Sequence, residues 1–499
     1  MYQLHEFIYR RSVLRAKEIG IRKVIGAQRK EIISQFLSEA VLITGVALIL
    51  AILLTVITLP FINKMSGLGL SINSLLQFKI LLPVLALPFV IGLISGIYPA
   101  IFMSSFIPAK VLKGMLKVGS GNVSFRQVLV VLQFSISIIL IVATTVVFKQ
   151  LQYIQNKALG FSKDNIITMG YYNGLTPQYN AFKDDLLKTG LVKDIGRSSR
   201  IPSGRLLDMQ GASVMENGTA QPVKFDLKNI TIDYGFIPTF GIKMAAGRNF
   251  SEAFKTDSVN CIINEQAVKE LGWKTPENAI GKNLTYGGVD GKVVDVVKNF
   301  HFESLHQKIL PMIFKLPNRD GLNRTSIKIS GTNAQASIAA VEATWHKYLP
   351  ETPFDYTFLD ERFGKLYQSE QQQSSLFTIF SFIAIFIACL GLFGLSAFTI
   401  TQRVKEIGVR KVLVASVPQI VAELSQDFLK LVILAAIISL PIAWYAMNKW
   451  LLDFEFRISI SWWILAMAGV LALIVAFVTI SFQSVKAALA NPVKSLRSE

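Results

Sequence analysis

The segment Arg15-Ala-Lys-Glu-Ile-Gly-Ile-Arg-Lys-Val-Ile25 occurs a second time 388 positions later, as Arg403-Val-Lys-Glu-Ile-Gly-Val-Arg-Lys-Val-Leu413. Eight of the eleven positions are identical, and the other three exchange one aliphatic residue for another. A repeat over this separation indicates two copies of one structural unit. The alternative is a chance match between two amphipathic surface helices, and the shared charged core argues against it.

Six stretches of the chain carry no Asp, Glu, Lys or Arg. Each reaches the roughly 18–20 residues that an α-helix needs to cross a ~30 Å hydrocarbon core. We therefore predict a multi-pass α-helical membrane protein with six transmembrane helices and one large polar domain. The stretches are 40–63, 80–109, 127–148, 371–402, 431–448 and 458–485, of which the fifth is the shortest and contains Pro441.

The net charge of +18 follows from membrane topology. Lys and Arg cluster before the first span, between the second and third, after the fourth and after the sixth. All four clusters fall on one side of a six-span chain, which predicts that both termini are cytoplasmic and that residues about 155–368 are extracytoplasmic. Attraction to anionic lipid explains the basic clusters, so no nucleic-acid partner is expected. Cys389 lies inside a span, so it is not expected to pair with Cys261.

The repeat and the spans divide the chain into four parts. In the first repeat unit we expect spans at about 40–63 and 80–102, and in the second at about 374–400, 429–448 and 460–484. The four parts are residues 1–124 (first repeat unit), 125–154 (transmembrane stalk helix), 155–368 (extracytoplasmic domain) and 369–499 (second repeat unit).

The polar domain alternates strand and helix patterns at both of its edges. Residues 155–202 and 321–368 together predict an α/β subdomain of the split ferredoxin type, and residues 203–320 predict a β-rich insertion. We expect subdomain strands at 166–169, 192–199, 326–330 and 354–359, subdomain helices at 178–189 and 333–348, and insertion strands at 261–263 and 293–297.

The helices beside this domain are longer than a bilayer requires. Neither Gly nor Pro occurs from Phe125 to about Lys157, which predicts roughly 50 Å of helix. On the return side, the stretch from Glu361 to Leu390 is interrupted only by Gly364. Two such helices would form a stalk that joins the domain rigidly to the spans. Frayed polar linkers are the alternative.

Each repeat unit closes with a Pro-x-Lys-x-Leu-basic tail, at 108–113 and at 492–497. In the second unit 276 positions separate Gln127 from Arg403, whereas only fourteen residues precede Arg15 in the first. By that symmetry we expect that an opening span, an external domain and a further span are missing, roughly 260 residues in all.

These segments and several motifs of the polar domain together resemble the FtsX-like (MacB-type) ABC transporter permeases, in their large duplicated form. The resemblance covers essentially the whole chain. One departure is Val414, which stands where the first copy has Gly26. The motifs are Asn491-Pro492, Phe240-Gly-Ile242, Gly247-Arg-Asn-Phe250, Ile263-Asn-Glu265, Ile280-Gly-Lys282 and Val296-Val-Lys-Asn-Phe-His-Phe-Glu-Ser-Leu-His306.

The resemblance implies a permease subunit of an efflux or extrusion system in the cell inner membrane, partnered by a separate ABC ATPase that binds the ATP. In this family, ATPase dimerisation generally moves cytoplasmic helices, and the stalk transmits that motion to the external domain, which is called mechanotransmission. Substrate classes across the family include lipoproteins, antimicrobial peptides, macrolides and signals to cell-wall hydrolases. A homodimer, pairing with a second permease, and a periplasmic adaptor stay open as further partners.

The sequence also indicates that the chain is not its own ATPase. No GxxxxGK[ST] pattern occurs, and the nearest candidate, 114–120, lacks the lysine. We therefore expect no enzyme activity and no cofactor. The repeated basic helices are the candidate ATPase-coupling elements, because their apolar residues recur at helical spacing and suit a groove on a partner. Binding to membrane lipid headgroups is the alternative. The candidate coupling residues are Lys17, Glu18, Gly20, Arg22, Lys23, Lys405, Glu406, Gly408, Arg410 and Lys411.

Two smaller patterns have a structural and a functional interpretation. His301 and His306 flank Glu303, but no third ligand is near in sequence, so we favour structural roles over a metal site. The small residues Gly391, Gly394, Ser396 and Ala397 favour close helix approach, either within the chain or in a dimer.

Two other functions stay open beside the permease. One is a membrane-anchored signalling or scaffold protein whose external domain senses a ligand or recruits a cell-wall enzyme. The other is a nonfunctional remnant of a longer protein.

Overall fold

The structure is a computed structural model that describes residues 22–67, 69–104, 125–216, 218–317, 321–402 and 416–489. It divides into two compact units. The helical unit comprises Met1–Lys149, Glu370–Trp450 and Ser459–Glu499, and the sheet unit comprises Gln150–Ser369 and Leu451–Ile458.

Within the described residues, six helices are long and apolar enough to cross a membrane, which confirms the six predicted spans. Several begin outside the uncharged stretches. The second-last helix begins at Val417, twelve residues before its predicted start at 429, because Glu423, Asp427 and Lys430 continue the helix beyond the apolar stretch. The six are α3 (Arg29–Ser66), α4 (Phe78–Ser104), α6 (Phe125–Asn156), α13 (Gln368–Gln402), α15 (Val417–Leu451) and α16 (Trp462–Leu489).

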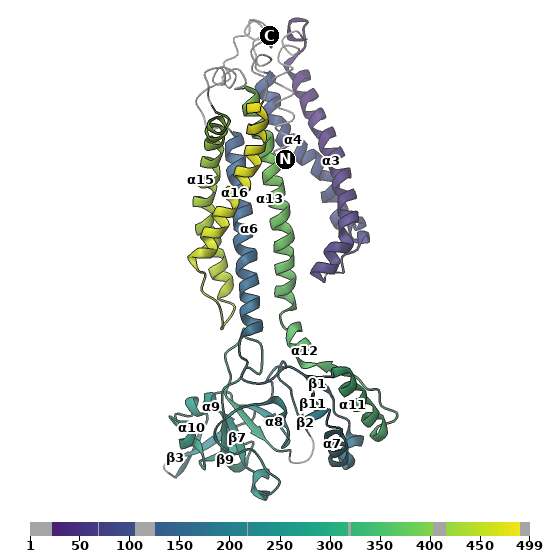
Figure 1. Cartoon of the computed structure of the whole chain (residues 1–499), viewed down its shortest axis with the longest axis vertical. Helices are drawn as coiled ribbons and strands as arrows, with labels where there is room; N and C mark the ends of the chain where they lie inside the picture. Colours follow the sequence, from purple (N-terminus) through teal and green to yellow (C-terminus); the bar gives the residue numbers. More distant parts are fainter. Residues whose placement is uncertain are drawn as a thin grey trace. The chain divides into compact units, whose positions relative to one another are not determined.

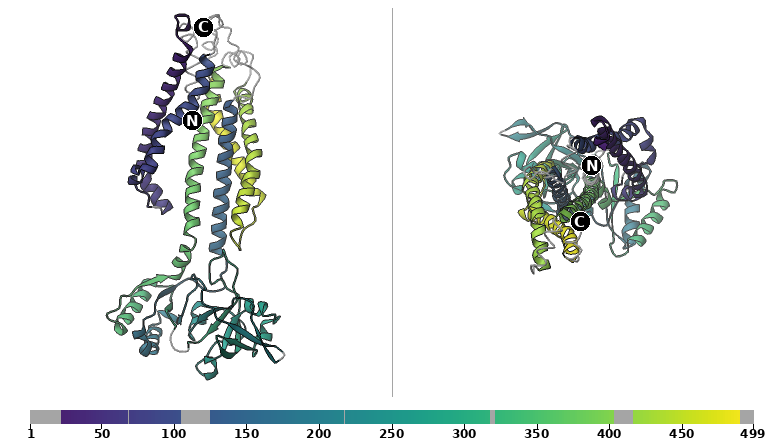
Figure 2. Two further views of the ribbon diagram at one scale, coloured as in Figure 1. Left: turned by 180° about the vertical axis from the view of Figure 1, so that it is seen from behind. Right: turned by 90° about the horizontal axis from the view of Figure 1, so that it is seen from above.

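Helices α6, α13, α15 and α16 share one apolar core and run side by side (Figures 1 and 2). Gly391 and Ser396 of α13 are buried within this single chain, beside core residues Leu392 and Leu395. This face of α13 therefore packs intramolecularly. Thr144 and Ser381 add a hydroxyl–hydroxyl hydrogen bond of 3.0 Å between α6 and α13.

Helices α3 and α4 form a second, closely packed pair (Figure 1). A Cβ at Gly92 would lie 2.8 Å from the Cα atom of Val41, and one at Gly96 would lie 3.0 Å from the Cβ atom of Ala40. Small residues let the two backbones approach in this way. The Thr44 hydroxyl donates a 2.8 Å hydrogen bond to the Pro88 carbonyl across the same contact.

The helix boundaries follow the sequence repeat. Helices α3 and α15 begin at positions 29 and 417, the same offset of 388 as the basic segments. Their N-termini are capped alike: the Gln28 amide donates to the Glu31 carboxylate at 3.0 Å, and the Ser416 amide donates to Gln419 Oε1 at 3.0 Å. Such reach-back caps satisfy backbone donors that the first helical turn leaves open.

The smaller sheet of the sheet unit has the strand order β12-β1-β11-β2, with every pair antiparallel. Helices α7 (Tyr179–Lys188) and α11 (Ala334–Tyr348) bury Phe182 and Trp345 in one core with this sheet. This is the predicted split arrangement. The last strand is shorter than expected, because Leu359 already begins helix α12 (Leu359–Lys365). The strands are β1 (Ile166–Gly170), β2 (Val192–Ser198), β11 (Arg324–Ile329) and β12 (Tyr356–Phe358).

The predicted insertion is a second sheet of eight strands, with the order β4-β3-β8-β9-β7-β10-β5 and β6 paired to β9. Short helices α8 (Phe236–Phe240), α9 (Glu265–Glu270) and α10 (Pro276–Ala279) accompany it. Its strands are β3 (Ala212–Glu216), β4 (Thr219–Pro222), β5 (Lys228–Thr231), β6 (Met244–Gly247), β7 (Cys261–Asn264), β8 (Asn283–Tyr286), β9 (Val289–Val297) and β10 (Met312–Lys315).

The two helices that the sequence predicts as a stalk differ from each other. Helix α6 is uninterrupted over 32 residues, as predicted. On the return side the chain makes two helices, because α12 ends at Lys365 and α13 begins at Gln368. The interruption therefore lies at Leu366–Tyr367, just after Gly364.

Candidate functional site: the basic helix end and the Asn299–His306 hub

The end of the first basic segment is tied to helices α3 and α4. The chain leaves a helical turn through Gly26 at φ +106°, where the Ala27 amide donates to the Arg22 carbonyl at 3.0 Å and the Gly26 amide to the Lys23 carbonyl at 3.2 Å. This is a Schellman cap, which favours glycine. Val414 occupies the corresponding position of the second copy, outside the described residues.

Two basic side chains of the segment bond to the helices, and a third, Arg29 of α3, joins α3 to α4. Arg22 donates to Gln35 Oε1 of α3 at 2.8 Å, and the Lys23 ammonium donates to the Ser104 carbonyl at the end of α4. Arg29 donates to the Ser104 hydroxyl at 3.2 Å. Burial and the neighbouring Arg29 lower the pKa of Lys23. A displacement of the basic segment would therefore reach both α3 and α4.

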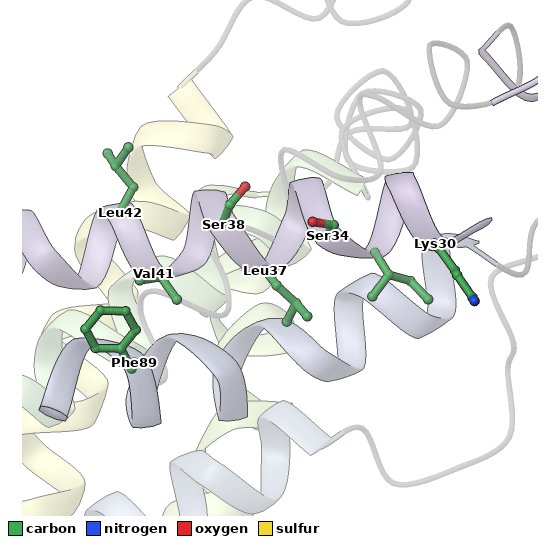
Figure 3. A pocket seen from close by; sticks show the side chains of 8 residues that line it. Lys30, Ser34, Leu37, Ser38, Val41, Leu42 and Phe89 are labelled. Atoms are coloured by element: carbon green, nitrogen blue, oxygen red, sulfur yellow. The ribbon is translucent and has the colours of Figure 1, made fainter. Parts of the chain in front are cut away.

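A groove of about 590 Å³ lies along the same end of α3 (Figure 3). Leu37 and Val41 face α4, whose Phe89 lies beside Val41, and Lys30 lies at one end (Figure 3). An elongated apolar molecule that carries an acidic group near Lys30 would match this lining in charge and polarity.

Of the ten candidate coupling residues, Arg22 and Lys23 are the two that lie within the described residues, where they bond to Gln35 of α3 and to the Ser104 carbonyl. Val24, part of the same segment, is 66% exposed, so an apolar side chain beside them is open to a partner. The closing tails and the second basic segment also lie outside the described residues. The other eight candidates, outside the described residues too, are Lys17, Glu18, Gly20, Lys405, Glu406, Gly408, Arg410 and Lys411.

In the sheet unit, several sequence motifs meet at one segment, Asn299–His306, which we call the hub. Asn299 fixes its start: its amide donates to Glu265 at 2.8 Å, and its side-chain oxygen accepts from the Gln266 amide at 2.9 Å. Phe300 is fully buried and stacks on Phe314 at 6.1 Å. Motifs that are more than thirty residues apart thus lock the hub onto the larger sheet.

The hub also contacts the chain where it leaves α6 and where it enters α13. The His301 amide donates to the Leu159 carbonyl at 2.8 Å, and the Leu305 amide donates to the Tyr367 hydroxyl at 2.8 Å. Gly160 makes the first contact possible: its φ is +84°, and a Cβ there would lie 2.7 Å from the Phe300 Cβ. The chain segments next to α6 and α13 are therefore both hydrogen-bonded to one short segment.

The two histidines of the hub pack against aromatic rings. His301 is mostly buried, and burial together with Lys157 lowers its pKa to about 4. Its ring meets Phe456 edge-on at 4.5 Å, and the His306 ring stacks on Phe454 at 4.1 Å. In the described part of the chain no group of three His, Cys, Asp or Glu side chains could hold a metal ion. The contacts of both histidines are those of structural residues.

The larger sheet holds an ion pair and a buried acid that sequence reasoning missed. Arg248 donates two hydrogen bonds of 2.7 Å to Asp257, which is fully buried. Burial alone would raise the pKa of Asp257, but Arg248 and the Ser251 amide hold it below its usual value. Asp295 in β9 is also fully buried, and burial raises its pKa to about 6. The Val296 amide and Arg248 oppose this rise without cancelling it.

Known proteins match both repeat units of the chain. A model of the family described as FtsX-like permease C-terminal matches residues 11–108 and 378–492. The macrolide export ATP-binding/permease protein MacB of Sodalis glossinidius is 24% identical over 211 residues, which are 39% of this chain and 32% of that protein. MacB of Campylobacter jejuni is 38% identical over 87 residues, 17% of this chain and 13% of that protein. The longer of these matches thus spans about a third of the relative's length.

Two solved structures of domains are similar to part of the chain. The periplasmic region of MacB from Actinobacillus actinomycetemcomitans is 15% identical, with a TM-score of 0.30, over 43% of this chain and 98% of that one. The extracellular domain of YknZ, a noncanonic ABC-type transporter from Gram-positive bacteria, is 15% identical, with a TM-score of 0.26, over 38% and 96%. The family model matches once on each side of the sheet unit, and each match contains one copy of the basic segment. The family match and the MacB relatives support an FtsX/MacB-type ABC transporter permease.

Proposed function

We propose that this chain is the permease subunit of an efflux or extrusion system and that it transmits the work of a separate ABC ATPase by mechanotransmission. The ATPase contacts the two basic segments on the cytoplasmic side. Helices α6 and α13 carry the resulting displacement to the sheet unit on the extracytoplasmic side. The relatives' name includes macrolide export, and macrolides are one substrate class compatible with this proposal.

The observation that carries the proposal is the hub, to which the chain segments beside both stalk helices are hydrogen-bonded. An uninterrupted α-helix of 32 residues extends roughly 48 Å, well beyond a ~30 Å hydrocarbon core. Such a helix has turns left over outside the membrane, where they can move a domain. Arg22 and Lys23 are bonded to α3 and α4, so force applied to the first basic segment would enter those helices directly.

The test is charge reversal in the second basic segment. In Arg410→Glu/Lys411→Glu we expect loss of the ATPase activity that co-purifies with the tagged chain, because the partner's groove would meet the wrong charge. Membrane insertion should be unchanged. Lys486→Glu, a basic residue in the last turn of α16, is the matched control and should retain the ATPase. Equal recovery of ATPase activity with all three chains would refute coupling through this segment. Co-purification of a sensor kinase or wall hydrolase instead would favour the scaffold alternative.

A further inference from the structure

The loop Leu451–Ile458, which joins α15 to α16, belongs to the sheet unit. Phe454 is only 1% exposed, and the His306 ring stacks on it at 4.1 Å. His306 Nδ1 lies 3.1 Å from the Asp453 carbonyl, and the Phe456 amide donates to the Leu305 carbonyl at 3.4 Å. The loop is thus held against the hub by both ring and backbone contacts.

One buried amide side chain fixes the far end of the same loop. Gln150 of α6 is 0% exposed. Its Nε2 donates to the Phe456 carbonyl at 2.9 Å, and its Oε1 accepts from the Ile458 amide at 3.0 Å. The Lys157 ammonium, also beyond the apolar part of α6, lies 4.7 Å from the centre of the Phe456 ring. A buried amide that uses both its donor and its acceptor defines the loop position more narrowly than apolar packing alone.

Helix α15 connects the second basic segment to this loop, so the loop is in a position to receive motion from that segment. Helix α15 begins shortly after the second basic segment, at Val417, and ends at the loop. Any displacement of that segment along α15 therefore arrives at Leu451–Ile458. We propose that this loop is a third connection between the membrane helices and the sheet unit, with Gln150 and His306 as its positioning residues. The inference rests on the proposed function, because it needs a motion to transmit.

The attachment itself is tested without nucleotide, by amide hydrogen exchange of the full chain in nanodiscs. In Gln150→Leu the Ile458 amide loses its acceptor, and we expect its exchange to become about tenfold faster. Gln152→Leu is the matched control, since Gln152 is exposed two positions away on the same helix. If the two variants protect the loop equally well, the attachment is refuted. His306→Leu, compared with His346→Leu at an exposed position of α11, gives a second test should Gln150→Leu fail to fold.

The transmission is tested in the complex with the co-purifying ATPase, by comparing exchange with ATP and orthovanadate against exchange without nucleotide. In the unaltered chain and in Gln152→Leu we expect nucleotide to change protection in both the hub and the loop. In Gln150→Leu the change in the loop should be lost while the ATPase stays bound. An unchanged response in Gln150→Leu would overturn the third connection and leave the proposed function standing. No nucleotide response in the unaltered chain would overturn the proposed function and this inference together.

Discussion

Asp295 makes the stability of the larger sheet depend on pH, and replacing it with Asn should remove that dependence. The side chain is fully buried in β9, and neither carboxylate oxygen has a hydrogen-bond partner of normal geometry in the described part of the chain. Burial raises its pKa from 3.8 to about 6. The folded state therefore holds this proton more tightly than the unfolded state does.

The direction and size of the effect follow from that difference. Between about pH 4 and pH 6 the folded state binds more protons than the unfolded state, so the free energy of unfolding falls as pH rises. Above pH 6 the penalty is complete, at about 1.4 kcal/mol for each of roughly two pKa units, or ~3 kcal/mol. Asn has the same shape and no charge, so Asp295→Asn should avoid this penalty. Relative to the parent, the population of molecules in which the larger sheet is open should fall about 100-fold at pH 7.5 and about tenfold at pH 5.

Cys261 provides the assay. Its side chain is 2% exposed and lies in β7, the strand that pairs with β9. Burial raises the pKa of its thiol to about 12. In a Cys389→Ser background it is the one thiol of the chain, so its labelling by an aromatic disulfide reports opening of the sheet. We expect Asp295→Asn to slow labelling about 100-fold at pH 7.5 relative to the parent. Equal labelling rates of the two chains from pH 4.5 to pH 7.5 would refute the reasoning.

Three further predictions concern single substitutions, two of them with a matched control variant. Gly247→Ala should destabilise the larger sheet by roughly 2 kcal/mol or more, because its φ is +100° and a Cβ there would clash with the Val294 carbonyl oxygen. Gly288→Ala, at φ +79° with open space around it, should cost about 1 kcal/mol in the same thiol assay. Asp257→Asn should cost about 1–3 kcal/mol at neutral pH, since the buried side chain at position 257 loses its charge-assisted hydrogen bonds, while water still solvates the partly exposed Arg248 guanidinium. Because the folded-state pKa of Asp257 is lowered, that difference should shrink as pH falls below its usual range, and a constant difference down to pH 3 would contradict the assignment. Gly92→Leu should separate α3 from α4 and lower the melting temperature of the full chain in detergent by several degrees, whereas Gly45→Ala, with no atom within 4 Å, should not.

The membrane helices were predictable because the hydrocarbon core imposes a length and excludes charge. The same reasoning missed the true start of α15, since polar residues such as Glu423 and Asp427 form helix outside the apolar stretch. The split subdomain was also predictable, because each of its strands and helices has a local pattern. The order of the larger sheet was not, since β7 pairs in parallel with β9 across a connection that no local pattern specifies.

The candidate site was likewise predictable in part: its contiguous motifs are visible in the sequence, but its long-range contacts are not. The basic repeats are visible in the sequence because they are contiguous. In the sequence, Gln150 is one of several polar residues near the end of a long helix. Its hydrogen-bond partners lie 306 and 308 positions away, so no local pattern identifies it. His301 and His306 suggested a metal site or a structural role, and only their contacts with Phe456 and Phe454 identify the structural role.

The low pKa of His301 has a consequence for the conditions under which such a protein can work. A ring that titrates at about pH 4 stays neutral in mildly acidic surroundings. Acidification outside the cell would therefore add no second positive charge beside Lys157, and the edge-on contact with Phe456 would persist. On the proposed outer side of the membrane the pH is set by the environment. The contact between the hub and the Leu451–Ile458 loop at His301 would therefore not change with mild acidification there.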